Sequence, residues 1–110
     1  MRLVYLESPL AGDVERNIAY ARACMRDALA RGEAPFASHL LFPQPDILDD
    51  DVPSQRRLGM EAGFAWAIAA DATVVYTDLG VSRGMQEGIN RAESIGRPVE
   101  YRTIPGWVAQ

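Results

Sequence analysis

Residues 3–13 of the chain read LVYLESPLAGD, and this stretch decides the fold class. Its first four residues are apolar and rich in strand formers, and they lead into a loop dense in turn-forming residues. Asp13 is a good helix N-cap, and after it apolar residues recur at three- and four-residue spacing until Gly32, a natural helix terminator. The stretch therefore predicts a buried strand, a loop and an amphipathic helix of about four turns.

Strand-like and helix-like segments alternate along the rest of the chain. In order, the sequence predicts a second strand that runs out into a loop at 35–42, a helix from 53 or 54 to about 70, a third strand at 73–76, a helix capped by Ser82 that ends near Gly96, and a fourth strand at 98–102. Strands that alternate with helices of this length form parallel sheets through right-handed crossovers. We therefore expect a doubly wound α/β fold with a parallel sheet of four or five strands and helices on both faces. The strand of Tyr5 should be central, between the strands that end near Ala37 and Tyr76.

Length and hydropathy favour one domain. The chain has 110 residues, 48% of them hydrophobic, which suits one compact core and is too little for two. We expect a single domain over residues 1–110, with its core at about 2–102 and a short tail at 103–110 that exposes Trp107. No apolar run approaches the roughly 18 residues that span a bilayer, so we expect a cytoplasmic protein without a membrane partner.

Charge and cysteine content exclude further classes. All eleven basic residues are Arg, spread singly among fifteen carboxylates, and the net charge is −4. A nucleic acid polymer is therefore not an expected partner, because its binding needs a concentrated basic face. Cys24 is the single cysteine, and no second Cys or His stands at metal-ligand spacing near it. We expect no structural zinc and no other cofactor.

Polar residues gather where three of the predicted strands end. Ligands of open parallel sheets bind outside the carboxyl ends of the strands. The three loops there carry the candidate site residues: Glu7, Ser8, Gly12, Asp13 and Arg16 in the first, Ser38, His39 and Gln44 in the second, and Asp78, Ser82, Gly84 and Glu87 in or after the third. The second loop continues into the long acidic segment 43–53, which is a candidate lid because loops of this length are usually functional or mobile.

Each candidate has a functional and a structural interpretation. The helix opening at Ser82 and Gly84 can bind a phosphate or carboxylate, or Ser82 merely caps the helix. His39 can donate to a ligand hydroxyl, or it is a satisfied structural residue. Asp78 can accept from sugar hydroxyls. Glu87 can act as nucleophile or general base, or it only stabilises the start of a helix; Arg16 can equally be a surface residue.

The helix predicted at 53–70 is apolar on more than one face. Met60, Phe64, Trp66 and Ile68 cannot all point into one small core, and Gly59 and Gly63 stand at a spacing that permits close helix contact. We therefore expect a homodimer or larger homo-oligomer that uses this helix.

Three segments carry a resemblance to a known family: Tyr5 to Pro9, His39 to Gln44, and above all 78–85 followed by 96–99. Over about residues 2–102 the chain resembles an uncharacterised bacterial and phage domain family grouped with the nucleoside 2-deoxyribosyltransferase superfamily. The resemblance implies a flavodoxin-like, three-layer α/β/α fold. It also implies a nucleoside or nucleotide-like small molecule as ligand.

Enzymes of that superfamily use a Glu early in the last helix to attack the sugar C1′, supported by an Asp on the preceding helix and a Tyr on the first strand. The resemblance places the Tyr at Tyr5. Without gaps, the place of the nucleophile falls on Gly88, with Glu87 one residue early, and the place of the Asp falls on Gly63, with Glu61 nearby. Tyr5 and Glu87 are therefore the catalytic candidates.

Two hypotheses follow for function. In the first, the protein is an N-glycosidic bond hydrolase or deoxyribosyltransferase that acts on nucleosides or nucleotides. In the second, it is a sensor or sequestering protein that binds a nucleotide-like molecule without cleaving it. A purely structural domain is disfavoured, because polar residues gather at the loops where the predicted fold binds ligands.

Overall fold

The computed structural model describes residues 1–107 of the chain. Its elements in chain order are β1 (Arg2–Glu7), α1 (Val14–Ala30), β2 (Glu33–Phe36), α2 (Ser38–Leu41), α3 (Pro53–Ala67), β3 (Ala72–Tyr76), α4 (Arg83–Ser94) and β4 (Val99–Arg102). None of the helices in this part of the chain is long and apolar enough to cross a membrane.

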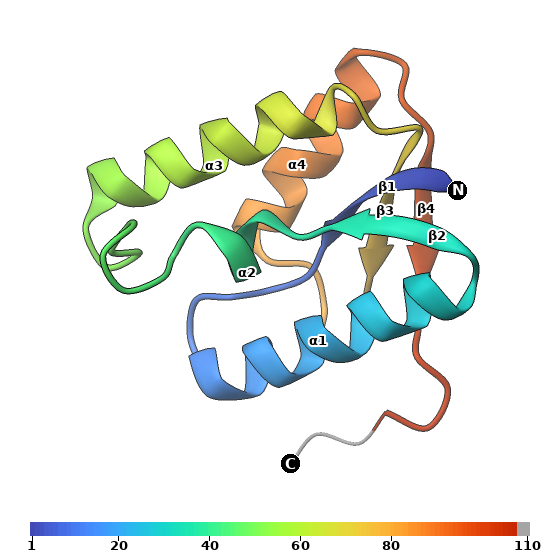
Figure 1. Cartoon of the computed structure of the whole chain (residues 1–110), viewed down its shortest axis with the longest axis horizontal. Helices are drawn as coiled ribbons and strands as arrows, with labels where there is room; N and C mark the ends of the chain where they lie inside the picture. The colour runs from blue at the N-terminus through green and yellow to red at the C-terminus, as the bar shows by residue number, and fades with distance from the viewer. Residues whose placement is uncertain (108–110) are drawn as a thin grey trace.

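The four strands form one parallel sheet in the order β2-β1-β3-β4. Helix α1 covers one face, and α3 and α4 cover the other (Figure 1). The predicted doubly wound α/β/α architecture is confirmed, with β1 central between β2 and β3. The carboxyl ends of β1, β2 and β3 meet at one edge of the sheet, where α2 and the first turn of α4 also lie.

Side-chain alternation along β1 divides its residues between the two layers. Val4 and Leu6 pack with Tyr20 and other buried side chains of α1. Since successive strand residues face opposite sides, Tyr5 and Glu7 face the layer of α3 and α4. Both are almost fully buried, with 4% and 7% of their surface exposed.

The predicted helix caps are confirmed. The Asp13 carboxylate accepts from the N–H of Arg16 at 3.2 Å, and the Ser82 hydroxyl accepts from the N–H of Met85 at 3.2 Å. Gly32, just after α1, has a φ of 82°, a conformation that glycine adopts without strain. These caps fix where α1 and α4 begin, and therefore where the loops at the strand ends finish.

The second strand ends close to its predicted end near Ala37, but the segment predicted as a loop after it contains a helical turn. β2 ends at Phe36, and the chain turns into the single-turn helix α2 at Ser38. The apolar residues after Ser38 are not part of the sheet. Leu40 instead packs against the hydrophobic core beside α1. Helix α3 also ends at Ala67 instead of near residue 70.

Two expectations about packing need correction. Trp107 is half-buried, not exposed, because its ring packs edge-on against Tyr20 with centroids 5.0 Å apart. The last three residues of the predicted tail, 108–110, lie outside the described residues. Gly59 and Gly63 approach their own chain: a Cβ on Gly59 would lie 3.2 Å from Leu48, and one on Gly63 would lie 2.6 Å from Ser38.

Candidate functional site

Two adjoining cavities open where β1 and β2 end. The smaller, the strand-end cavity, has a volume of about 300 Å³ and is lined by residues of β1, the loop after it, α2, α3 and the start of α4. Its polar lining consists of Tyr5, Glu7, Ser8, Ser38, His39, Asp50, Arg56, Ser82 and Arg83. A volume of this size is at the lower end of the range for small-molecule sites.

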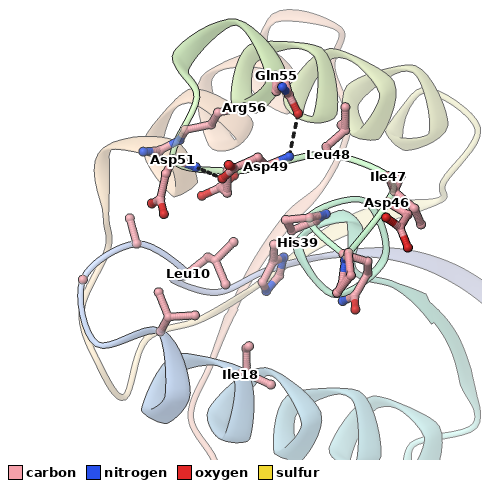
Figure 2. A pocket seen from close by; sticks show the side chains of 17 residues that line it. Leu10, Ile18, His39, Asp46, Ile47, Leu48, Asp49, Asp51, Gln55 and Arg56 are labelled. Carbon is pink, nitrogen blue, oxygen red and sulfur yellow. Dashed lines mark hydrogen bonds between the residues drawn. The ribbon is translucent and has the colours of Figure 1, made fainter.

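The larger, the loop cavity, has a volume of about 620 Å³ and lies on the other side of His39 and Leu10. Figure 2 shows it between Ile18 of α1 and the segment that carries Asp49 and Arg56. The acidic segment is held by local hydrogen bonds, since the N–H of Asp49 donates to Gln55 Oε1 at 2.7 Å. The long loop predicted as a lid candidate therefore forms a wall of this cavity.

Two hydrogen-bonded pairs line the strand-end cavity and form what we call its floor. The hydroxyls of Tyr5 and Ser38 are 2.8 Å apart, and Ser8 Oγ lies 2.7 Å from His39 Nε2. Burial lowers the pKa of His39 to about 4, so its ring is neutral at physiological pH. Burial, with the nearby Glu7 carboxylate, raises the pKa of Tyr5, so its hydroxyl keeps its proton. This floor offers neutral donors and acceptors that suit a hydroxylated ligand.

Glu7 is the most unusual group at the site. Its Oε2 is buried and has no hydrogen-bond partner among residues 1–107, although buried carboxylates are normally paired. Burial first, and then the negative charge of Glu87, raise the pKa of Glu7 to about 8. At neutral pH this carboxyl group is therefore mostly protonated.

Other residues occupy the side-chain space of Gly88 and Gly63, the two glycines at which the resemblance would put the catalytic carboxylates. A Cβ on Gly88 would lie 2.6 Å from Cδ of Glu7 and closer still to its Oε2. A Cβ on Gly63 would lie 2.6 Å from the Tyr5 hydroxyl oxygen and from Ser38. The structure therefore places the Glu7 carboxylate against Gly88, and the Tyr5–Ser38 pair against Gly63.

The first turn of α4 closes the strand-end cavity opposite the floor. Ser82 caps the N–H of Met85, and the N–H of Gln86 donates to the Ser82 carbonyl, so the N–H groups of Arg83 and Gly84 are left without a partner in residues 1–107. A Cβ on Gly84 would meet Arg56 Nη2 only at 3.8 Å, so the backbone is open there. Arg56 and Arg83 form no ion pair within the described part of the chain.

The structure brings together most of the predicted site residues. Tyr5, Ser8, His39, Ser82 and Gly84 line the strand-end cavity, and Gly12 lines the loop cavity. Arg16 lines neither, since its guanidinium donates to Asn17 Oδ1 at 3.1 Å.

Asp78 also lies away from both cavities. Its carboxylate accepts from the Tyr20 hydroxyl at 2.6 Å and from the N–H of Ile104 at 3.0 Å. These bonds tie the loop after β3 to α1 and to the segment after β4. The prediction that Asp78 faces a sugar does not fit this arrangement, because both of its oxygens are engaged in the fold.

Glu87 lies on the outer side of α4. Its carboxylate accepts from Arg57 Nη2 at 2.7 Å, and Glu61 in turn accepts from Arg91 at 2.7 Å. Both carboxylates belong to a partly exposed network of arginines between α3 and α4. Neither lines the strand-end cavity. Glu87 is one residue from Gly88, which turns its side chain by about 100° on the helix, and Glu61 is two residues from Gly63.

Sequence reasoning placed Glu7 in the first loop but assigned it no role. The signal was its position directly after a buried strand, on the same face as Tyr5. No group of three His, Cys, Asp or Glu side chains in residues 1–107 is arranged to hold a metal ion.

Comparisons with known proteins identify the family of the chain and a solved structure with a similar fold. Residues 2–102 match the family described as a domain of unknown function, DUF7768. The chain belongs to this family. No curated protein matches it. Among solved structures, the fold is similar to that of a 2-deoxyribosyltransferase from the psychrotolerant bacterium Bacillus psychrosaccharolyticus, described as a biocatalyst for the synthesis of nucleosides. The TM-score is 0.69 at 15% identity, over 98% of this chain and 77% of that one. The predicted resemblance and fold are thereby confirmed.

Proposed function

We propose that this protein binds a nucleoside or a nucleoside monophosphate in the strand-end cavity and cleaves its N-glycosidic bond, with water or a second base as acceptor. The observation that carries the proposal is the set of neutral polar side chains that converge on this cavity at the carboxyl ends of β1 and β2, on a fold similar to that of a 2-deoxyribosyltransferase.

The floor of the cavity suits a sugar. The Tyr5–Ser38 and Ser8–His39 pairs present hydroxyl groups and a neutral imidazole, which exchange hydrogen bonds with sugar hydroxyls without the cost of burying a charge. Phe64 and Met60 line the same cavity and give it an apolar wall for a planar base.

The start of α4 suits an anion. The free N–H groups of Arg83 and Gly84 lie at the positive end of the helix, and the Arg56 guanidinium is near them. A phosphate bound there would be held by charge and by backbone donors. Of the acidic segment 46–51, only Asp50 lines the strand-end cavity, whereas Asp46, Asp49, Asp50 and Asp51 all line the loop cavity. A phosphate is therefore favoured at α4 and disfavoured in the loop cavity.

One observation favours the alternative, a binding protein that does not cleave its ligand. The superfamily's two carboxylate positions are Gly88 and Gly63, and the neighbouring Glu87 and Glu61 are paired with arginines outside the cavity. A protein without any acid at the cavity would bind and release the intact molecule. Asp50 and Glu7 both line the cavity, and the buried Glu7 is the reason that cleavage is the preferred proposal.

We also propose that two copies associate through the outer face of α3. Leu58, Trp66 and Ile68 are each about 60% exposed, which is unusual for large apolar side chains on one helix (59%, 59% and 63%). Phe64 points inward instead, so the face that remains for a partner is smaller than the sequence predicted.

The proposal is tested by incubating the protein with the 2′-deoxynucleosides, the ribonucleosides and their 5′-monophosphates and measuring free base by chromatography. Tyr5→Phe removes one hydroxyl from the floor and should lower turnover at least tenfold. Tyr101→Phe is the matched control, because Tyr101 is exposed on β4 away from the cavity. Release of free base by neither the parent protein nor the control would reject cleavage.

A further inference from the structure

We propose that Glu7 is the acid that protonates the departing base, and that Gly88 is a glycine because the Glu7 carboxyl group needs its space. This inference rests on the proposed function, since it assigns the proton donor for that reaction.

The geometry supports this role in three ways. Glu7 lines the strand-end cavity, so its carboxyl group can contact a ligand there. In the described part of the chain its Oε2 has no hydrogen-bond partner, and a buried polar atom of this kind normally has one. Finally, its position against α4 is possible only because residue 88 has no side chain. A fold that gained nothing from Glu7 would be better served by an apolar residue here.

Glu87 is a poorer candidate for the same task. Its carboxylate is engaged by Arg57 Nη2 at 2.7 Å, so contact with a ligand would break this ion pair. It also lies outside the strand-end cavity. Glu7, in contrast, has no cation at hydrogen-bonding distance among residues 1–107.

The charged and titratable groups around Glu7 come from four elements and from the segment before α3. Tyr5 lies on the same face of β1, the neutral His39 lines the cavity from α2, and Arg56 lines it from α3. Asp50 lines it from the segment before α3, and Arg83 lines it from α4, from which Glu87 also approaches. Arg57 and Arg91 balance the charge of Glu87. The protonated form of Glu7 is favoured chiefly because the group is buried.

The proposed step is balanced with water as the acceptor. The Glu7 O–H bond breaks as its proton binds the base, and the electron pair of the C1′–N bond leaves with the base, which departs neutral. The oxygen of a water molecule then binds C1′, and the proton that this water loses returns to the Glu7 carboxylate. The products are the free base and the free sugar, and Glu7 is restored.

The test compares Glu7→Gln with Glu93→Gln, an exposed residue on α4, using the panel compound that the parent protein cleaves fastest. General acid catalysis is worth about 10²–10⁴-fold, so we expect Glu7→Gln to lower kcat at least 100-fold with KM changed less than about threefold. Glu93→Gln should keep the parent kcat. Turnover by Glu7→Gln at the parent rate would overturn the role of Glu7 while leaving the proposed function intact. A parent protein that cleaves no compound would reject both.

Two further measurements separate an acid from a structural residue. In the parent protein kcat should fall as pH rises through about 8, because Glu7 loses its proton there; a kcat that is flat from pH 6 to 9 would overturn the inference even if Glu7→Gln failed to fold. The second uses 7-methyl-2′-deoxyguanosine, whose base is already cationic and leaves without protonation. Glu7→Gln should cleave it within about tenfold of the parent rate, and a loss as large as for the unmethylated nucleoside would count against acid catalysis.

Discussion

The carboxyl group of Glu7, at the end of β1, occupies the space that a side chain on Gly88 of α4 would need. The two residues are far apart in the sequence, and the contact joins the sheet to the helix that closes the strand-end cavity. It also places a carboxyl group at the site beside a helix position that is a glycine.

The first prediction concerns the stability of Gly88→Ala. A Cβ at residue 88 overlaps the Glu7 carboxyl group, so we expect the free energy of unfolding to fall by about 1–3 kcal/mol, as for other overpacked cores. Alanine is otherwise favoured over glycine in helices by about 1 kcal/mol. Gly84→Ala, whose Cβ would meet no atom closer than 3.8 Å, is the control and should be neutral or stabilising. Urea denaturation measures both, and equal effects would contradict the overlap.

The second prediction concerns stability against pH. The pKa of Glu7 is about 8 in the folded protein and 4.5 in the unfolded chain, so folded molecules bind more protons in this range. Stability should therefore fall as pH rises from 4.5 to 8, by up to about 1.4 kcal/mol for each pH unit.

His39 acts in the opposite direction over part of this range. Its pKa is about 4 when folded and 6.5 when unfolded, so its contribution to stability grows as pH rises from 4 to 6.5. The contribution of Glu7 is therefore clearest between pH 6.5 and 8. In that window thermal or urea unfolding should show a slope for the parent protein and for Glu93→Gln, and no slope for Glu7→Gln. A slope that survives in Glu7→Gln would mean that another group is titrating.

The third prediction concerns the anion site at α4. Gly84→Val places a branched side chain between the Arg56 guanidinium and the free N–H groups of the helix. The structure has room for this side chain, but a phosphate could then no longer bind in the same space. We expect binding of nucleoside 5′-monophosphates to weaken at least tenfold while binding of the parent nucleosides changes little. Calorimetry with matched pairs of ligands measures the difference. Unchanged monophosphate affinity would place the phosphate elsewhere.

The fourth prediction concerns association. If two copies meet through the outer face of α3, light scattering at micromolar concentration should give a dimer for the parent protein and a monomer for Trp66→Glu. Tyr101→Glu is the control, because Tyr101 is equally exposed but lies on β4. A parent protein that scatters as a monomer would reject the interface.

The fold was predictable because its signals are local. Apolar strand runs, the caps Asp13 and Ser82, and Gly32 mark the elements, and their alternation leaves few topologies. The short helix α2 was missed because an apolar run of this length does not distinguish a strand from a single helical turn. The burial of Trp107 was missed because it depends on Tyr20, which is distant in sequence.

The candidate site was predictable only in part, because some of its features depend on contacts between residues that are distant in the sequence. The rule that ligands bind at the carboxyl ends of parallel strands depends on topology alone. It correctly located Ser8, His39, Ser82 and Gly84 at a cavity. It could not show that the Asp78 carboxylate is engaged by Tyr20. Nor could it show that Glu7 is buried without a partner, because that depends on a glycine on a helix distant in the sequence.

The most direct test of the account is to incubate the protein with 2′-deoxynucleosides and their 5′-monophosphates in ¹⁸O-labelled water and to analyse the products by mass spectrometry. Hydrolysis with Glu7 as the acid predicts equal amounts of free base and free sugar, with the label on the anomeric oxygen of the sugar. It also predicts loss of both products in Glu7→Gln. Compounds that raise the melting temperature of the protein but are all recovered intact would contradict cleavage and leave a protein that only binds its ligand.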